Sequence, residues 1–264
     1  MKKYWFAFTA TIKNHLIYPG QLLAWSISDI FYFAIFPFVW LAVYASGDQV
    51  TGYSRLEIVS YYIAVALVSA ISITHNSRAI RDDIHQGHLN SFLARPLNYL
   101  LYKFTDTLGY KFISLFIAGI MLLSSKLIFS SYVKIPFSFL SILIFIGLAI
   151  IAFLISFLVH SVIGLTAFWT GENSGIQNFY YLIFSVFSGG LAPLALFPEY
   201  LQIASNYLPF KYLLYLPAEA FLERVNSVQT SKVFAVGLIW IIVLLGVAIL
   251  MWRKGIKTYE GRGI

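Results

Sequence analysis

The chain has 264 residues, of which 59% are hydrophobic and only 11% are charged, and it carries a net charge of +7. A soluble domain has about 25% charged residues, so this composition would leave large apolar patches in water. It excludes a soluble enzyme, a nucleic-acid-binding domain and a disordered chain. The chain contains no cysteine, which excludes disulfides and thiolate metal sites.

The N-terminal segment 1–20 predicts an amphipathic helix that lies in the membrane interface. Its apolar residues recur at spacings of three and four, and its lysines lie elsewhere on the helical wheel. These apolar positions are Tyr4, Trp5, Phe8, Ile12 and Leu16. The apolar stretch after Lys2 and Lys3 is too short for a cleavable signal peptide. The helix is either a simple anchor or a lever that contacts a partner.

Six uncharged runs predict six membrane-spanning helices. A helix needs about 20 mostly apolar residues to cross the hydrocarbon core, where backbone groups cannot stay unpaired. The predicted spans are 22–44, 58–75, 108–129, 137–168, 176–196 and 233–252. The fourth run is too long for one perpendicular helix. We expect one tilted or projecting helix there, with a break near Gly147 as the alternative.

The distribution of Lys and Arg predicts the orientation. With the N-terminus inside the cell, twelve of the 18 basic residues fall in inside segments and the other six fall outside. Because cytoplasmic loops are enriched in Lys and Arg, we expect both termini in the cytoplasm. The expected location is a cell membrane, most simply a bacterial inner membrane.

The 76–107 loop between the second and third spans predicts two short helices separated at Gly87. Pro96 ends the second helix at or before Arg95. Arg78 and Asp82 lie four residues apart, a spacing that supports a helix. An apolar stripe of Ile80, Ile84, Leu89, Phe92 and Leu93 runs along these helices. A solvated connector needs no exposed stripe, so we expect a docking surface for a cytoplasmic protein. Packing on the bilayer surface is the alternative.

The 189–232 segment between the fifth and sixth spans predicts a re-entrant hairpin. Two glycines and two prolines, Gly189, Gly190, Pro193 and Pro198, break the end of the fifth span. Short helices are expected at 199–207 and 212–223, with a turn between them at 208–210. Non-helical backbone at membrane depth must be buried in protein or line a cavity. The segment is therefore a gate or a structural plug at the outer face.

Few polar residues fall within the predicted spans. Asp29 is a candidate for function, although it could instead face lipid headgroups or pair with Lys111. We expect His160 to hydrogen-bond to a neighbouring helix rather than to carry protons, and Glu172 to make an interfacial contact. The sequence holds no nucleotide-binding, hydrolase or metalloprotease motif, which predicts no catalytic site, cofactor or metal on this chain.

Three motifs then resemble one family. The first is Ile84-x-x-Gly87-x-Leu89-x-x-x-Leu93-x-Arg95-Pro96 in the 76–107 loop. The second is Gly190-x-x-Pro193-Leu194-x-x-Phe197-Pro198, followed by Leu208-Pro209-Phe210. The third is the tail Gly255-x-Lys257-x-Tyr259. Together with the six spans, they resemble the membrane subunit, or permease, of an ABC transporter of the type 2 exporter fold.

The resemblance implies an all-α, multi-pass permease, with 1–264 forming a single transmembrane domain. It implies a coupling helix that sits in a groove of an ATPase subunit. The implied coupling residues are Arg78, Arg81, Asp82, Ile84, Gly87, Leu89, Leu93, Arg95 and Pro96. The implied gate residues at the outer break are Gly189, Gly190, Pro193, Phe197, Pro198, Pro209 and Phe210.

The resemblance also implies partners: a second permease, identical or paralogous, membrane lipids, and two separate ATPase subunits that hold ATP and Mg. Nucleic acid is not expected. Spans one, two and five would line a path for an amphiphilic or lipophilic substrate, with Phe31, Phe36, Tyr61 and Phe184 as candidate lining residues. The alternatives are a lipid-modifying membrane enzyme, a non-catalytic scaffold and an importer subunit.

Overall fold

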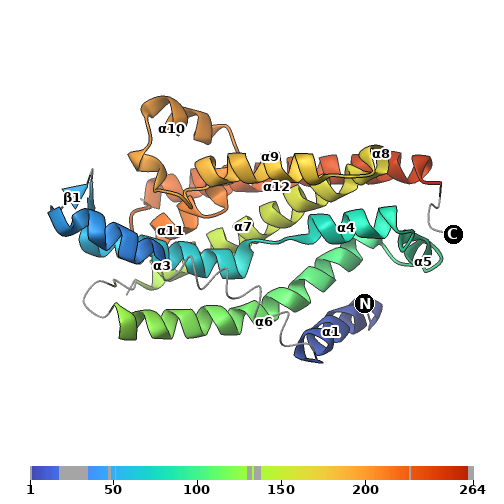
Figure 1. Cartoon of the computed structure of the whole chain (residues 1–264), viewed down its shortest axis with the longest axis horizontal. Coiled ribbons are helices and arrows are strands. Elements are labelled where there is room, and N and C mark those ends of the chain that lie inside the picture. The colour runs from blue at the N-terminus through green and yellow to red at the C-terminus, as the bar shows by residue number, and fades with distance from the viewer. Residues whose placement is uncertain are drawn as a thin grey trace.

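The computed structural model describes residues 2–17, 35–46, 49–50, 52–129, 133, 138–225 and 227–260. It shows an elongated bundle of helices (Figure 1). The longer helices are α1 (Lys2–Ile17), α3 (Arg55–Ser72), α4 (Asn76–His85), α6 (Tyr99–Ile128), α7 (Phe139–Leu165), α9 (Ser174–Phe187) and α12 (Ser227–Thr258). Residues 35–43 are also helical and lead into the 3-10 turn η1 (Tyr44–Ser46).

Short elements connect these helices. They are the antiparallel pair β1 (Gln49–Val50) and β2 (Tyr53–Ser54), α5 (Leu89–Leu93), α8 (Ala167–Thr170), η2 (Leu194–Leu196), α10 (Glu199–Asn206), η3 (Phe210–Tyr212) and α11 (Tyr215–Phe221). Ser54 begins α3 with a capping box, in which its hydroxyl accepts from the Glu57 amide and the Glu57 carboxylate accepts from the Ser54 amide. The two short helices expected around Gly87 are confirmed as α4 and α5.

Four stretches of the described chain are long and apolar enough to cross a membrane: Arg55–His85, Tyr99–Ile128, Phe139–Thr170 and Thr230–Thr258. They contain the predicted second and sixth spans, and they cover all but one or two residues of the predicted third and fourth spans. Most of the predicted first span lies outside the described residues. The predicted fifth span is shorter than expected, because α9 ends at Phe187 rather than continuing to 196. The count of six spans therefore stays a prediction.

The long fourth run forms a continuous helix through Gly147, so the alternative of a break there is wrong. Gly147 instead allows α7 and α12 to pack closely. A Cβ atom at this position would lie 2.7 Å from Cζ of Phe234 on α12. The glycine therefore serves helix packing and does not interrupt the helix.

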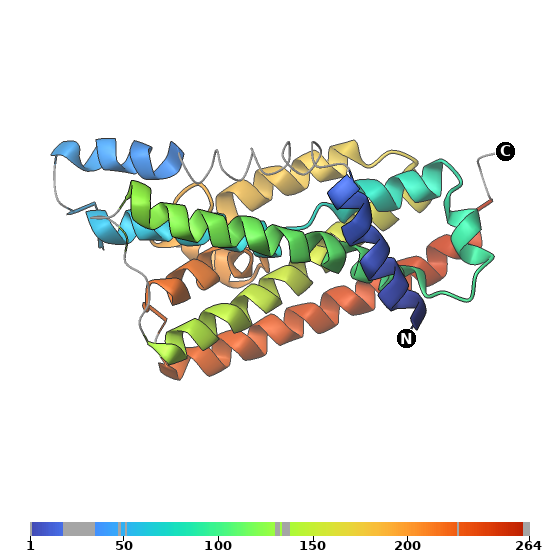
Figure 2. The same cartoon turned by 90° about the horizontal axis from the view of Figure 1, so that it is seen from below.

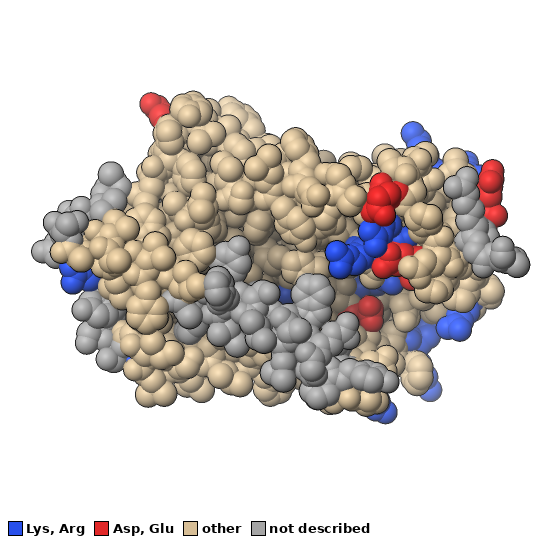
Figure 3. All heavy atoms as spheres, viewed as in Figure 1, with Lys and Arg blue, Asp and Glu red and all other residues tan. Residues whose placement is uncertain are grey.

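Helix α3 lies at the centre of the bundle and packs against α6, α7 and α11. The outward faces of α6 and α12 are apolar: Leu127 is 85% exposed and Ile242 is 69% exposed. Apolar side chains on the outside of a helical bundle fit a lipid environment. Figure 3 shows that Lys, Arg, Asp and Glu gather mainly at one end of the molecule, whereas its middle is nearly free of charge.

The charged end holds α4, α5 and α8, together with the last turns of α12 (Figure 1). Helix α1 crosses the bundle obliquely near the same end, as Figure 2 shows. The predicted amphipathic helix is present, but its apolar stripe does not all face the protein. Within this stripe, Trp5 and Leu16 are exposed, whereas Tyr4, Phe8 and Ile12 are half-buried. Below, the end of the molecule with α4, α5 and α8 is called the charged end, and the end with β1, β2 and α10 is called the opposite end.

Replacing Gly147 by alanine should lower the midpoint of thermal unfolding, because the added methyl group overlaps the Phe234 ring. Overpacking of this kind costs about 1–3 kcal/mol. The matched control is Gly119→Ala on α6, where an added Cβ meets no atom within 4 Å. Alanine in an open helical position should leave stability unchanged or raise it by up to about 1 kcal/mol. Equal midpoints for the two variants in detergent would contradict the packing role.

Candidate functional site

The chain leaves helical geometry between α3 and α4, at residues 73–75, and α7 supplies hydrogen bonds to this break. The Thr74 amide donates to Oγ of Ser156 over 2.8 Å, and Nδ2 of Asn76 donates to Oγ of Ser161 over 2.9 Å. Ile73 is extended, with ψ at 127°. Buried backbone groups must be paired, so polar side chains of α7 make this break possible inside the bundle.

His160 on α7 takes part in the same contact. Its Nδ1 lies 3.2 Å from Oγ of Ser77, which in turn donates to Oε1 of Gln177 on α9. The expected hydrogen bond from His160 to a neighbouring helix is confirmed. The chain Gln177–Ser77–His160 joins α9, α4 and α7. Asp29, the other polar candidate within a span, lies outside the described residues.

The 76–107 loop folds back on the chain rather than exposing its apolar stripe. Ile80 and Leu89 are completely buried, and Ile84 is 5% exposed. They pack with Leu165 at the end of α7 and against Trp252 of α12. The expectation of an exposed stripe is therefore wrong for these three residues, whereas Leu93 at the end of the stripe is exposed. The last turns of α7 and α12 extend alongside α4 and cover it. A prediction made from the loop sequence alone does not take these two helices into account.

A buried ion pair fixes the loop to the start of α6. Nζ of Lys103 lies 2.6 Å from Oδ2 of Asp83, and the Tyr99 hydroxyl donates to the same oxygen over 2.7 Å. Asp83 and Lys103 are both less than 10% exposed. The Tyr99 ring stacks on Trp252 at 4.8 Å. Helix α4, the start of α6 and α12 are thereby held in one arrangement.

Helix α1 is tied to the other end of the same loop. Nζ of Lys3 donates to the carbonyl of Pro96, and the Asn98 amide donates to the Tyr4 hydroxyl over 3.0 Å. Thr11 donates to Asp106 on α6. These contacts fix α1 to the end of the loop and to α6.

The coupling candidates thus divide into buried and exposed groups. Ile84 and Leu89 are buried, and Gly87 (φ +77°) allows the turn between α4 and α5. The exposed candidates at the charged end are Arg78, Leu93, Arg95 and Pro96. Leu93 is an apolar side chain that is 45% exposed.

The expected pairing of Arg78 with Asp82 is wrong. Asp82 binds Arg81 instead, with 2.7 Å between Nη2 of Arg81 and Oδ1 of Asp82. Arg81 also reaches Glu172 over 2.9 Å. This contact links α4 to the segment just before α9. Glu172, for which a contact was expected, therefore binds Arg81.

The second break follows α9, and side chains of α3 supply its hydrogen bonds. The Tyr61 hydroxyl donates to the carbonyl of Gly189 over 2.7 Å, and the Tyr62 hydroxyl donates to that of Leu191 over 2.7 Å. Gly189 has φ +84°, and a Cβ atom there would lie 2.6 Å from the Tyr61 oxygen. Only glycine fits this position, for both reasons.

The rest of the 189–232 segment returns into the bundle. The turn at Pro209 leads into η3 and α11, which packs against α3 and α7. Helix α10 confirms the expected helix at 199–207, and Pro198 precedes its first residue. Among the other gate candidates, Gly190 lies within the break, Pro193 and Pro209 are buried, and Phe197 and Phe210 are half-buried.

A polar cluster closes the opposite end. The Tyr53 hydroxyl donates to Oε1 of Glu219 over 2.7 Å, and Arg224 lies 4.1 Å above the Tyr53 ring. Arg224 also reaches Glu219 at 3.7 Å and Glu57 at 3.5 Å. Burial raises the pKa of Glu219 above its usual range, although the Tyr53 hydrogen bond and the Arg224 charge oppose this. Burial and Glu219 raise the pKa of Tyr53, which keeps its hydroxyl a donor.

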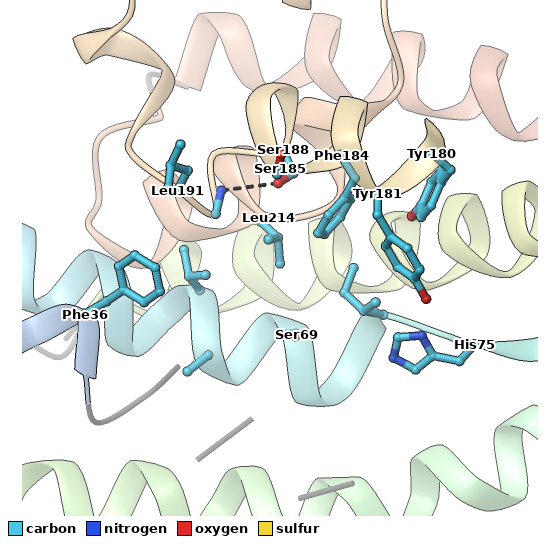
Figure 4. A pocket seen from close by; sticks show the side chains of 14 residues that line it. Phe36, Ser69, His75, Tyr180, Tyr181, Phe184, Ser185, Ser188, Leu191 and Leu214 are labelled. Carbon is cyan, nitrogen blue, oxygen red and sulfur yellow. Dashed lines mark hydrogen bonds between the residues drawn. The ribbon is translucent and has the colours of Figure 1, made fainter. Parts of the chain in front are cut away.

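Two adjoining cavities run along α3 and α4, on the side that faces α9. The first has a volume of about 480 Å³, and its apolar walls include Phe36, Val65 and Phe184 (Figure 4). The second, about 420 Å³, is lined by polar side chains of α4 and α9. His75 and Tyr181 line both cavities, and Figure 4 shows the Tyr181 hydroxyl turned toward His75. We call the two cavities together the groove.

Phe36 and Phe184 line the first cavity, and their place along a transport path stays a prediction. Tyr61 does not line this cavity, because it is completely buried and hydrogen-bonded to the second break. Phe31 lies outside the described residues.

Sequence reasoning missed the residues that hold the two breaks and the loop. They are Tyr62, Thr74, Ser156, Asp83 and Lys103. One pattern could have found the first break: Ser72, Thr74, Asn76 and Ser77 form a polar run at the end of an apolar span. No local pattern pairs Asp83 with Lys103, because they are 20 residues apart.

Comparison with models of known protein families identifies the family of this chain. A family model described as ABC-2 family transporter protein matches residues 30–263. The chain therefore belongs to the ABC-2 family of transporter proteins. Comparisons with curated proteins and with solved structures gave no match.

Replacing Lys103 by methionine should destabilise the protein by about 3–5 kcal/mol, because it leaves the Asp83 carboxylate buried without its cation. Adding Asp83→Asn to that variant should restore part of the loss, since no buried charge then remains. The control is Lys257→Met at the exposed end of α12. The measurement is the thermal unfolding midpoint of the unmodified protein and of the three purified variants. A Lys103→Met variant as stable as Lys257→Met would rule out a structural role for the pair.

Proposed function

We propose that this ABC-2 family protein is the permease subunit of an ATP-driven exporter, in which separate ATPase subunits bind ATP and Mg. The observation that carries the proposal is the α4–Gly87–α5 unit. It lies at the charged end, exposes a small surface around Leu93, and is tied to α6 and α12 by Asp83, Lys103 and Tyr99. A force applied to α5 would therefore move the helices of the bundle rather than bend a flexible loop.

The proposed arrangement has six spans, including one over 22–44 and one built on α9, with both termini in the cytoplasm. The charged end then faces the cytoplasm, which agrees with the excess of Lys and Arg expected there. Residues 1–264 form one transmembrane unit, with 1–20 as the interfacial helix, 76–107 as the coupling loop and 189–232 as the outer segment. A second permease, identical or paralogous, completes the transporter.

The proposed coupling surface consists of Leu93, Arg95 and Pro96. Leu93 gives it an apolar anchor, and Arg95 adds an exposed charge two residues further on. Ile84, Gly87 and Leu89 act from inside by holding α5 on α4. The contacts of Lys3 and Tyr4 with residues 96–98 would make α1 move together with this surface.

The proposed transport cycle uses the two breaks. Closure of the ATPase subunits on ATP displaces α5 and α4, and the break at 73–75 allows α4 to tilt relative to α3. Tyr61 and Tyr62 pass any movement of α3 to residues 189–191 at the second break. The 189–232 segment then opens the groove outward. The apolar wall of the groove favours an amphiphilic or lipophilic substrate.

The direct test replaces Leu93 by aspartate and measures co-purification with a candidate ABC ATPase from the same cell. Because Leu93 is exposed, the protein should stay folded while its affinity for the ATPase falls about tenfold, as for an interface anchor. The matched control is Ile203→Asp on α10, an apolar side chain that is 51% exposed at the opposite end and should leave co-purification unchanged.

Unchanged co-purification of Leu93→Asp would contradict the coupling surface. Aspartate at the buried Ile84 or Leu89 would be a poor test, because it would disrupt packing whether or not an ATPase binds.

A further inference from the structure

The groove combines two kinds of wall along one line. Its first half is formed mainly by apolar side chains such as Phe36, Ala66 and Leu214. Its second half, toward α4, is formed by hydroxyl, amide and charged groups that include Ser77, Asn178 and Asp82. A cavity with this polarity fits a molecule that has an apolar tail and a polar headgroup.

The charges around the polar half are of both signs and are not fully paired. Asp82 and Glu172 share the single guanidinium of Arg81, at 2.7 and 2.9 Å, which leaves an excess of negative charge on their side. Arg78 lines the same cavity and makes no ion pair with an acidic residue within the described chain. Arg78 therefore lacks a negatively charged partner, and the pair Asp82 and Glu172 lacks a second positively charged partner.

These two positions are close together on one surface of α4. Residues four apart on a helix lie on the same face, with Cβ atoms about 5–6 Å apart. Tyr181 lines both halves of the groove and offers an aromatic ring beside them. Aromatic rings bind quaternary ammonium groups by cation–π attraction, and a guanidinium binds phosphate with paired hydrogen bonds.

The N-terminus of α9, with its partial positive charge, is not available as a second phosphate site. Helix α9 begins at this cavity, but Glu172 already accepts from the amides of Asn173 and Ser174, each at 3.1 Å. The first turn of α9 is thus occupied by a carboxylate of the chain itself. Arg78 remains as the group that can receive an external phosphate.

We propose that the groove binds a zwitterionic amphiphile, with its phosphate on Arg78, its ammonium group near Asp82 and Tyr181, and its tail in the apolar half. A purely anionic headgroup would meet the excess charge of Asp82 and Glu172. A purely cationic one would meet Arg78. This assignment names a substrate class for the proposed exporter and rests on that proposal, although binding itself requires no ATPase.

The test measures equilibrium binding of radiolabelled dodecylphosphocholine to the full chain in uncharged maltoside micelles. Dodecyl phosphate and dodecyltrimethylammonium serve as matched anionic and cationic competitors. We expect saturable binding, with the zwitterion bound more tightly than either competitor. Arg78→Gln should weaken it about tenfold, through loss of a charge-assisted hydrogen bond. Arg78→Lys keeps the charge and should weaken it less, and Asp82→Asn should shift the preference toward dodecyl phosphate.

The control variant is Arg253→Gln, an exposed arginine of α12 outside the groove, which should bind as the unmodified chain does. Equal affinities for Arg78→Gln and Arg253→Gln, tighter binding of dodecyl phosphate than of the zwitterion, or no saturable binding would each overturn the assignment. Binding that depends on Arg78 without any associated ATPase would support the headgroup site and contradict the exporter function. An associated ATPase without such binding would do the reverse.

Discussion

Two stretches of non-helical backbone lie inside this bundle, and the arrangement of the other helices depends on how their hydrogen bonds are satisfied. An unpaired amide or carbonyl buried in an apolar interior costs about 1–3 kcal/mol. At residues 73–75 the partner comes from α7, where Oγ of Ser156 accepts from the Thr74 amide, and Ser161 of α7 accepts from the side chain of the adjoining Asn76. At residues 189–191 they come from α3, through the Tyr61 and Tyr62 hydroxyls. Helix α3 therefore takes part in both breaks.

This arrangement relates the two ends of the molecule. The break after α3 is continuous with α4, which the Asp83–Lys103 pair fixes to α6. The break after α9 is continuous with the segment that returns as α11 and packs on α3. In the proposed exporter, a displacement at the charged end reaches the opposite end through α3, because both connections are short and are hydrogen-bonded to neighbouring helices.

Much of the fold could be predicted from the sequence, because charge-free runs and Gly/Pro positions are local properties. The runs located four stretches that can span a membrane, and Gly87 and Pro96 located the ends of α4 and α5. The end of α9 was placed too late, because an apolar stretch such as Leu194–Leu196 satisfies hydropathy as a 3-10 turn as well as it does as a helix. Hydropathy does not distinguish burial in lipid from burial in protein.

The candidate site was predicted less well, because its geometry depends on contacts between distant residues. The apolar stripe of Ile80, Ile84 and Leu89 was identified correctly, but the residues that cover it are Leu165 and Trp252, on other helices. Tyr61 was expected to line a path on the basis of its aromatic character, whereas its position is determined by a carbonyl 128 residues away. The groove likewise combines residues of α3, α4 and α9.

The most direct measurement is hydrogen–deuterium exchange of the Tyr61→Phe variant, compared with Tyr200→Phe, whose side chain is 69% exposed on α10. The account predicts that Tyr61→Phe loses about 1–3 kcal/mol of stability from the unpaired Gly189 carbonyl. It also predicts faster exchange of the Gly190 and Tyr215 amides, which bond to Ser188 beside that carbonyl. Exchange and stability equal to those of Tyr200→Phe would contradict the dependence of the second break on α3.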